Sequence, residues 1–161
     1  SGQRVRACTT RVGPTLFTSL HMRKIIQDIY IEWGHCDPAK VVFNPRYFEW
    51  IDAAAMRLLL EAVPDIHGGS ETTGFAGIPL IKNECKFRSP ARFNDTLQLT
   101  SEVTQVGAAK INLRHQFKRG DELLVECDET RVWTIRDPDS VDQFKAAAIP
   151  EDIRNALSSD D

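Results

Sequence analysis

An aspartate held in a proline-containing turn is the residue of this chain best placed to do chemistry. Asp37 lies in the segment 33–39, which reads WGHCDPA. Pro38 restricts the backbone of the turn, so the carboxylate keeps a defined direction. Seven residues after Asp37, the pair Asn44-Pro45 predicts a helix start, where free backbone N–H groups and the positive end of the helix dipole can face a carbonyl oxygen. A base or nucleophile beside an oxyanion donor is the minimum that acyl transfer requires.

The residues around Asp37 leave more than one role open. An aspartate before a proline often fixes its own turn, which is the structural alternative to catalysis. His35 could tune the carboxylate or act as a hydrogen-bonding spacer. Cys36 is not expected to be a nucleophile, because no arrangement of histidine and acid in the sequence supports a thiolate.

The helix after this loop has the clearest pattern in the sequence. Asn44 is its expected N-cap, Pro45 its first helical residue, and Pro64 ends it. Apolar residues recur between them at Tyr47, Trp50, Ile51, Ala54, Ala55, Leu58, Leu59 and Ala62. This pattern predicts a helix of about five turns that is covered on several sides.

The remaining elements are mostly strands. From β-forming residues and from the alternation of apolar and polar residues, strands are expected at 25–31, 80–87, 97–103, 111–117 and 123–135. Turns are expected near Gly107 and at 119–121, a loop at 68–77 and a short helix at 150–157. One strand, a buried helix and a four-strand meander predict an α+β domain, with a five-stranded antiparallel sheet wrapped around one long central helix.

Composition limits the possible functions. The 161 residues suit one compact domain, and 42% hydrophobic residues suffice for a core. A net charge of −3 without a basic patch argues against nucleic acid and membrane surfaces as partners. The four cysteines are scattered without C-x-x-C spacing, so we expect no metal site and no disulfide framework, but reduced thiols in a cytoplasm.

The first 22 residues differ in character from the rest. Residues 1–22 contain arginine, serine and threonine but no acidic residue, and they have no strong period. A tag or unstructured extension is the preferred interpretation, and a mitochondrial transit peptide is the alternative. The single domain is accordingly expected over residues 23–161.

Six segments of the chain share the pattern of a known family. They read GHCDPA at 34–39, FNPRY at 43–47, WIDAA at 50–54, GIP at 77–79, DETRVW at 128–133 and AIPED at 148–152. Together they resemble the 4-hydroxybenzoyl-CoA thioesterase family of hot-dog proteins. The resemblance implies a hot-dog fold and hydrolysis of an acyl-CoA thioester, without a metal or a cofactor, since coenzyme A is part of the substrate.

The resemblance also implies roles for individual residues. Asp37 matches the catalytic aspartate, which either attacks the thioester carbonyl or activates a water molecule. The backbone N–H of Asn44 would polarise the carbonyl oxygen. Asp52 matches an aspartate that reaches the phenolic hydroxyl of the substrate across the dimer, while packing at the subunit interface or a solvated charge is the alternative. Tyr47 and His35 are further candidates for substrate binding.

Basic residues at strand ends and turns are candidates for binding coenzyme A, whose phosphates prefer arginine and lysine. They are Arg88, Arg92, Lys110, Lys118 and Arg119. The chain departs from the family pattern in the turn 107–110, which reads GAAK where relatives tend to be basic. Lys40 replaces a usual glycine, and Asn44 replaces a usual aromatic residue.

An aromatic acyl-CoA such as 4-hydroxybenzoyl-CoA is the favoured substrate. An aliphatic acyl-CoA or an acyl carrier protein thioester is the alternative. The departures at Lys40 and Asn44 leave open a non-catalytic acyl-CoA-binding protein, and a dehydratase of the same fold would need an acid and a histidine acting together. Pairing of sheet edges is a common way to protect them, so we expect a homodimer, with a homotetramer as the fuller assembly, in the cytoplasm.

Overall fold

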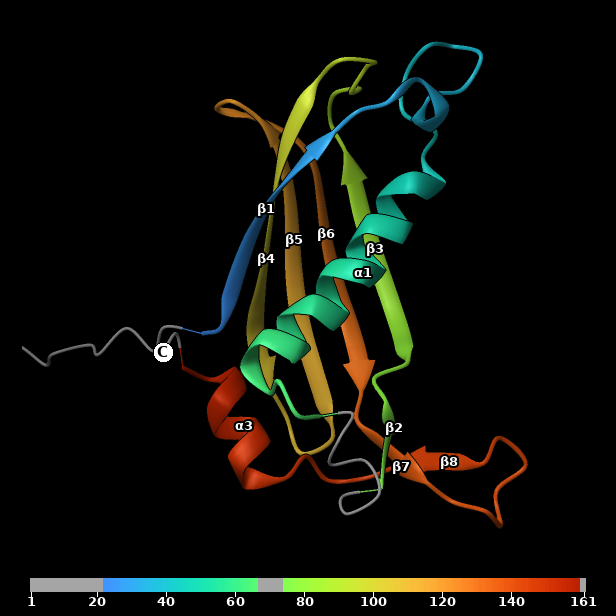
Figure 1. Cartoon of the computed structure of the whole chain (residues 1–161), viewed down its shortest axis with the longest axis vertical. Coiled ribbons are helices and arrows are strands. Elements are labelled where there is room, and N and C mark those ends of the chain that lie inside the picture. The colour runs from blue at the N-terminus through green and yellow to red at the C-terminus, as the bar shows by residue number, and fades with distance from the viewer. Residues whose placement is uncertain (1–21, 67–73, 160–161) are drawn as a thin grey trace, which may run out of the picture.

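A five-stranded antiparallel sheet forms the body of the protein (Figure 1). The computed structural model describes residues 22–66 and 74–159, so the predictions for residues 1–21 and for most of the 68–77 loop fall outside the described residues. In spatial order the strands are β1 (Lys24–Tyr30), β4 (Thr96–Val106), β5 (Lys110–Arg119), β6 (Glu122–Val132) and β3 (Leu80–Phe87). The five predicted antiparallel strands are confirmed. Buried and less buried residues alternate along β4 and β5 with the period of a pleated sheet.

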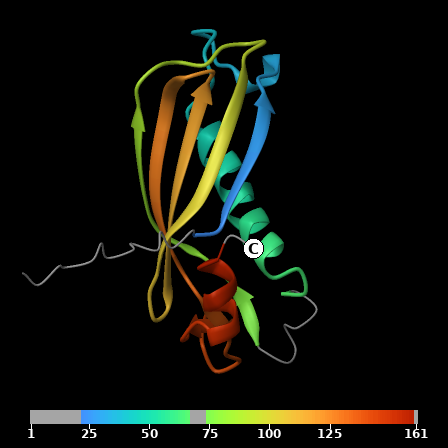
Figure 2. The same ribbon diagram turned by 90° about the vertical axis from the view of Figure 1, so that its left-hand side faces the viewer.

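Helix α1 (Pro45–Ala62) lies against one face of this sheet, as Figure 2 shows from the side. Its bounds agree with the prediction. Its buried residues recur every three or four positions, at Tyr47, Ile51, Ala54, Ala55, Leu58 and Leu59. This spacing gives the helix one apolar side, which packs on the sheet.

Two details of α1 differ from the prediction. The opposite side of the helix is exposed at Phe48, Asp52 and Ala53, so the described chain covers the helix on one side rather than on several. Asn44 precedes the helix with helical dihedral angles, and its side chain makes no capping hydrogen bond. Asn44 therefore holds the predicted N-cap position without a side-chain cap, and Pro45, whose missing N–H costs nothing in the first turn, begins the helix as predicted.

The order of the strands differs from the predicted meander. Only β4, β5 and β6 follow one another in the sheet, while β3 pairs with β6 and β1 pairs with β4. The segment between β3 and β4 therefore crosses the end of the sheet, where the Val42 N–H donates to the Ala91 carbonyl (2.9 Å) and the Ile31 N–H to the Asp95 carbonyl (2.8 Å). Alternation reveals which residues share a face, but it does not reveal which strands are neighbours.

A second, three-stranded sheet extends one end of the molecule. It consists of β2 (Phe75–Gly77), β7 (Thr134–Arg136) and β8 (Phe144–Ala146). The single strand predicted over 123–135 is thus two strands, with a break at Trp133. The Trp133 ring is 1% exposed and packs on Phe75 with centroids 4.6 Å apart, so burial of this ring directs the chain from one sheet to the other.

The C-terminal helix α3 (Glu151–Leu157) agrees with its prediction. Its residues Ile153 and Leu157 are buried in the common core. Arg154 donates to the carbonyls of Val106 and Ala108 at 3.2 and 3.4 Å, which ties the helix to the β4–β5 turn. Within the described ranges, no helix combines the length and the hydropathy that crossing a bilayer requires.

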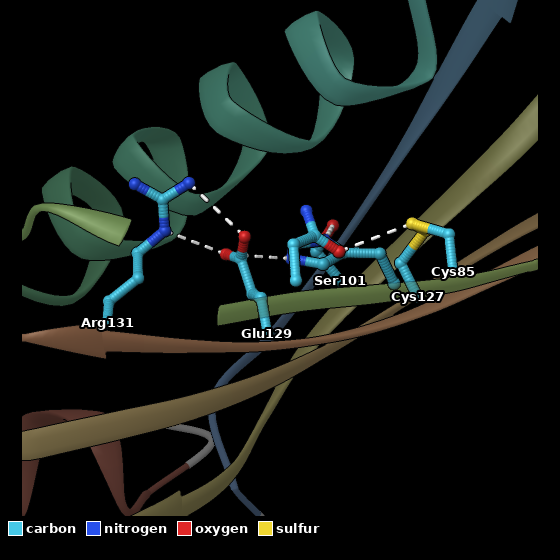
Figure 3. The surroundings of a disulfide bond; sticks show 7 residues. Cys85, Ser101, Cys127, Glu129 and Arg131 are labelled. Atoms are coloured by element: carbon cyan, nitrogen blue, oxygen red, sulfur yellow. Dashed lines mark hydrogen bonds and ion pairs between the residues drawn. A yellow bond between two sulfur atoms is a disulfide. The ribbon is translucent and has the colours of Figure 1, made fainter. Parts of the chain in front are cut away.

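A disulfide joins Cys85 of β3 to Cys127 of β6 (Figure 3). The prediction of reduced thiols is wrong for this pair. The two residues are 42 positions apart in the sequence, yet they are direct partners in the β3–β6 register with Cα atoms 4.1 Å apart. The sequence spacing gives no sign of the bond, because only the strand order brings the two cysteines together. Cys36 is free.

Candidate active site

The loop that carries Asp37 is built like a small hairpin. Cys36 and Val42 form an isolated antiparallel bridge. The Asp37 N–H donates to the Val41 carbonyl and the Phe43 N–H to the His35 carbonyl, both at 2.9 Å. The backbone before Asp37 and the backbone leading into α1 therefore lie side by side, and the loop places the aspartate at a fixed position relative to the helix start.

Lys40 closes the tip of this hairpin. Its N–H donates to the Asp37 carbonyl at 2.8 Å, and its φ is 61°, in the left-handed region. Glycine adopts this conformation without steric cost, whereas a residue with a Cβ does not. The usual glycine of the family pattern suits this backbone, and Lys40 keeps the same turn at some cost in conformational energy.

The two carboxylate oxygens of Asp37 have different surroundings. Oδ1 accepts a hydrogen bond from the Ala39 N–H at 2.8 Å, so the turn-fixing role considered as the alternative to catalysis is present. Oδ2 has no hydrogen-bond or ion-pair partner among the described residues. One oxygen is thus anchored in a half-buried side chain while the other is available for chemistry.

A pocket of about 220 Å³ opens beside the start of α1. Its lining residues are Val41, Val42, Asn44, Tyr47, Phe87, Arg88, Ser89 and Pro90. The Asn44 N–H has no acceptor in the described part of the chain, whereas the Arg46 and Tyr47 N–H groups donate to the carbonyls of Phe43 and Asn44. A backbone donor at the pocket is therefore free, although Asp37 itself is not a lining residue.

Only part of this lining was predicted from the sequence. Asn44, Tyr47 and Arg88 were candidates, but the wall formed by Phe87, Ser89 and Pro90 was not. These residues end β3 or follow it directly, and they reach the pocket because β3 occupies the edge beside β6. The predicted meander placed β3 next to β4, so no segment was expected to cross the end of the sheet. Recognising β3 as an edge strand would have pointed to these residues.

Tyr47 contributes its ring to the pocket. It is buried and makes edge-to-face contacts with Trp50, Phe87 and Phe117 at centroid distances of 5.5, 5.7 and 5.0 Å. Burial raises the pKa of Tyr47 to about 12, against an opposing hydrogen bond with the backbone of Ala91. Its hydroxyl is thus protonated and occupied by the protein, so the ring is the part that can contact a ligand.

His35 and Cys36 support the loop. The Nδ1 atom of His35 accepts a hydrogen bond from the Glu32 N–H at 3.0 Å, and its ring meets Trp50 edge-on at 5.2 Å. This arrangement corresponds to the spacer role rather than to tuning of Asp37. The Cys36 thiol faces the Glu32 carbonyl, 3.9 Å from the sulfur.

Asp52 forms an ion pair that the sequence did not predict. Its Oδ1 lies 2.8 Å from Nη2 of Arg131. The Nε of Arg131 donates to Glu129 at 2.8 Å and its Nη1 to the Ile78 carbonyl at 3.2 Å, as Figure 3 shows for the pair on β6. Asp52 is 73% exposed, whereas the Arg131 side chain is 6% exposed, so a buried arginine holds a carboxylate at the helix surface.

Glu129 connects this pair to a buried histidine. His115 Nε2 is 3.1 Å from Glu129 Oε1, without a well-aligned hydrogen bond among the described residues, and His115 Nδ1 is 2.7 Å from Ser101 Oγ. Burial raises the pKa of Glu129, but the close approach of His115 and the hydrogen bonds and charge of Arg131 outweigh it, so this pKa lies below the ordinary value. Burial lowers the pKa of Arg131, and Glu129 and Asp52 more than restore it.

An acid and a histidine lie together inside the sheet, away from the start of α1. Glu129 and His115 are 3% and 0% exposed, and neither lines the pocket beside α1. The signal for them was available in the sequence, because Glu129 and Arg131 share the alternating phase of the buried residues Val125 and Cys127 on β6. Charged residues at buried positions of a strand are rare unless they are paired.

The predicted coenzyme A residues separate into two groups. Arg88 lines the pocket, and Arg119 donates to the Pro90 carbonyl at the same end of the sheet, although its guanidinium is also paired with Asp95 and Glu122 at 2.7 Å each. Arg92 and Lys118 lie at this end too. Lys110 begins β5 and Arg119 ends it, so Lys110 is about 30 Å away within one chain.

Comparison with known proteins places this arrangement in a family. A profile of the Thioesterase-like superfamily matches residues 31–157. The chain is 28% identical over 136 residues to the 4-hydroxybenzoyl-CoA thioesterase of Pseudomonas sp. (strain CBS-3), in a match that covers 81% of this chain and 94% of that protein. The profile match spans most of the chain, including the Asp37 loop, α1 and most of the five-stranded sheet.

Solved structures agree with this match. The structure of 4-hydroxybenzoyl-CoA thioesterase from Pseudomonas sp. strain CBS-3 superposes with a TM-score of 0.75 at 26% identity, over 83% of this chain and 99% of that one. A variant of 4-hydroxybenzoyl-CoA thioesterase complexed with 4-hydroxybenzoyl-CoA gives 0.77 at 27% identity, over 84% and 99%. The sheet and helices are those of a hot-dog fold, and the chain belongs to the thioesterase-like superfamily.

Proposed function

We propose that this protein hydrolyses acyl-CoA thioesters to a free acid and coenzyme A. The observation that carries the proposal is the unpaired Asn44 N–H at the pocket, fixed by the hairpin that also holds Asp37, in a chain of the thioesterase-like superfamily. Membership of that superfamily and the similarity to 4-hydroxybenzoyl-CoA thioesterase support the reaction class.

Asp37 supplies the reacting oxygen in this proposal. Its free Oδ2 either attacks the thioester carbon, which forms a mixed anhydride and releases the thiolate of coenzyme A, or takes a proton from a water molecule that attacks instead. In the first case water then cleaves the anhydride. The negative charge that develops on the carbonyl oxygen is stabilised by the Asn44 N–H and the positive end of the α1 dipole.

An aromatic acyl group suits the pocket wall. Tyr47 and Phe87 present rings there, and Val41 and Val42 add apolar surface. Such walls favour a flat ring through edge and face contacts, so 4-hydroxybenzoyl-CoA or another aromatic acyl-CoA is the proposed substrate. An aliphatic acyl-CoA or an acyl carrier protein thioester remains the alternative within this class.

Arg88 lines the pocket, and we propose that it contacts the nucleotide end of coenzyme A. Its closest acid, Glu126, is 3.9 Å away, so most of its hydrogen-bonding capacity is open to a phosphate. Arg92 and Lys118 would add charge beside it. Arg119 is occupied by Asp95 and Glu122, and Lys110 would contribute only from a second subunit.

A homodimer completes the proposed enzyme, with a homotetramer as the fuller assembly. The edge strand β3 exposes Leu80, Ile81 and Phe87, and α1 exposes Phe48. Edge pairing through β3 would bury this apolar surface and satisfy the open backbone groups of the edge. In that assembly the sheet wraps around α1 as the central helix, and the partner covers the side of α1 that one chain leaves exposed.

The test is the Asp37→Asn variant assayed with a panel of benzoyl-, 4-hydroxybenzoyl- and aliphatic CoA thioesters, with free thiol as the readout. We expect the variant to lose at least about 10²–10⁴-fold in kcat while binding acyl-CoA as tightly as the unchanged protein. Binding without any thiol release from the unchanged protein would identify an acyl-CoA-binding protein instead. Rates within one decade across the panel would contradict the aromatic preference.

A further inference from the structure

The segment 88–95, here called the crossing segment, forms a wall of the pocket and also contacts the Asp37 hairpin. It crosses the end of the sheet between β3 and β4 (Figure 1), and its first three residues line the pocket. The Ala91 carbonyl accepts a hydrogen bond from the Val42 N–H at 2.9 Å, and the Ala91 backbone also makes a hydrogen bond with Tyr47. Because Val42 and Tyr47 line the pocket too, the position of the crossing segment helps to set the shape of the pocket.

Arg119 holds the crossing segment at two points. Its Nη1 atom donates to the Asp95 carboxylate at 2.7 Å and to the Pro90 carbonyl at 3.4 Å. Asp95 is the last residue of the segment and Pro90 is near its beginning, so one guanidinium joins the two ends. Arg119 ends β5, the middle strand of the five-stranded sheet, so both ends are tied to a strand that has neighbours on each side.

Glu122 brings a further part of the pocket wall to the same guanidinium. Its Oε2 atom is 2.7 Å from Arg119 Nη2, and hydrogen bonds from Arg119 and from Ser89 lower the pKa of Glu122 below its ordinary value of 4.5. Ser89 lines the pocket, so it is linked to Arg119 through Glu122. Asp95 is fixed in turn, because its Oδ2 also accepts the Arg92 N–H at 2.9 Å.

We infer that Arg119 is a positioning residue that holds the pocket wall against the Asp37 hairpin. Both of its Nη atoms are occupied by protein acceptors, in Asp95, Glu122 and the Pro90 carbonyl. Arg119 therefore acts on a ligand through the wall, and not as the coenzyme A contact that its residue type suggested. The consequence for turnover rests on the proposed thioesterase function, whereas the consequence for the crossing segment does not.

A phosphate contact and a positioning residue respond in opposite ways when the paired acid loses its charge. Asp95→Asn keeps an acceptor for the Arg92 N–H but weakens the contact with Arg119, because a charge-assisted hydrogen bond becomes a neutral one. If Arg119 bound a phosphate, this change would free its guanidinium and tighten the binding of coenzyme A. If Arg119 positions the wall, the same change loosens the crossing segment and weakens binding.

The first test follows the crossing segment by amide hydrogen exchange in the full chain, without an activity assay. We expect exchange in 88–95 and at the Val42 N–H to become about tenfold faster in Arg119→Gln. Asp95→Asn should change the same amides in the same direction by a smaller factor. Unchanged exchange in 88–95 in Arg119→Gln overturns the inference.

Arg114→Gln is the matched control. Arg114 lies on the same strand, and its side chain is 43% exposed where that of Arg119 is 37% exposed. It forms a comparable ion pair with Asp128 at 2.9 Å, and neither residue lines the pocket beside α1. The control removes the same charge and should leave the exchange in 88–95 unchanged. Equal acceleration in both variants would reveal a general loss of stability and would overturn the inference.

The second test compares thioesters of one aromatic acid with coenzyme A and with pantetheine, which lacks the nucleotide and its phosphates. In Arg119→Gln, KM should rise for both esters by the same factor of about five, as for the loss of one net hydrogen bond, with a smaller change in kcat. Asp95→Asn should also raise both KM values. An increase confined to the coenzyme A ester overturns the inference, as does tighter binding of free coenzyme A by Asp95→Asn in calorimetry.

Arg119→Lys tests whether charge alone is enough. A lysine ammonium is a point charge without the planar fork of arginine, so it cannot reach Asp95, Glu122 and the Pro90 carbonyl at once. We expect fast exchange in 88–95 to persist, and full recovery of exchange and KM would overturn the two-point contact. Should Arg119→Gln fail to fold, Arg119→Lys and Asp95→Asn carry both tests. Absence of thiol release from the unchanged protein contradicts the proposed function, while the exchange measurement still decides the role of Arg119.

Discussion

Asn44 contributes its backbone rather than its side chain to the proposed site. Its side chain makes no capping bond, and its φ of −48° lies near the range of proline. Asn44→Pro therefore removes the free N–H while the helix start keeps its shape. We expect kcat with acyl-CoA to fall about 10²–10³-fold, as for the loss of one oxyanion donor.

Asn44→Ala is the matched control for this change, because it keeps the N–H and deletes the side chain. Its kcat should stay within a factor of a few of the unchanged protein. Equal losses in both variants would mean that the side chain, not the backbone donor, matters. Circular dichroism of both proteins checks that α1 is intact.

Ionisation of Tyr47 should lower the free energy of unfolding at alkaline pH. Its pKa is raised to about 12 in the folded protein, whereas the ordinary tyrosine value, which an unfolded chain approaches, is 10.0. Since the folded pKa is the higher one, this contribution is fully present below pH 10 and is lost as pH rises through 12. Urea unfolding should show a decrease of about 2–3 kcal/mol from this group over that range.

Tyr47→Phe isolates the contribution of the hydroxyl. The variant keeps the ring contacts with Phe87 and Phe117 and cannot ionise. Its free energy of unfolding should fall less steeply above pH 10 than that of the unchanged protein. Parallel slopes for the two proteins would show that the Tyr47 hydroxyl is not the source of the alkaline sensitivity.

Arg131 of β6 forms ion pairs with Asp52 on α1 and with Glu129 on its own strand. Removing Arg131 and removing the Asp52 charge should lower the free energy of unfolding by different amounts. Arg131→Met leaves Glu129 buried with only His115 nearby, which we expect to cost about 3–5 kcal/mol in the free energy of unfolding. Asp52→Asn breaks the pair at an exposed carboxylate and should cost less than about 1 kcal/mol. Urea unfolding of both variants at neutral pH measures the difference.

Acid should weaken the same cluster. The folded pKa of Glu129 lies below its ordinary value of 4.5, so its contribution is present above that value and is lost as pH falls through the folded pKa. The Arg131→Met protein should therefore lose less stability on acidification than the unchanged one. An identical acid dependence of both proteins would contradict the role of Arg131.

Local sequence patterns predicted where the helices and strands lie, whereas the order of the strands in the sheet depends on long-range pairing. Pro45 and Pro64 bracket α1, and alternation located β4 and β5, because these signals act within a few residues. The pairing of β3 with β6 depends on contacts between distant segments, and with it the Cys85–Cys127 bond and the pocket wall were missed. The sequence pattern placed Trp133 inside one strand, and only the second sheet shows that the chain breaks there.

The residues of the candidate site show the same difference between local and long-range signals. The Asp37 loop and the Asn44 donor are contiguous in the sequence, so spacing alone brought them together. Asp52 was a candidate, but its partner Arg131 is 79 positions away. The cationic candidates were chosen by residue type, which is why one of them, Lys110, lies at the far end of β5.

The proposed dimer concerns the molecule as a whole. Ile81 is half exposed on the edge strand β3, and Val141 is fully exposed in the loop between β7 and β8. Ile81→Asp places a charge in the proposed interface and should convert the protein to monomers in light scattering after gel filtration, with loss of thioesterase activity. Val141→Asp should remain a dimer, and dimers for both variants would place the interface elsewhere.

The three tryptophans sample three depths of the molecule. Trp33 is 67% exposed beside Phe93, Trp50 is half-buried next to His35, and Trp133 is sealed at the junction of the two sheets. Collisional quenchers such as acrylamide should therefore extinguish the emission of Trp33 first and that of Trp133 last. A chain carrying Trp133 as its sole indole would report detachment of the small sheet by a red shift in fluorescence, before the main sheet opens.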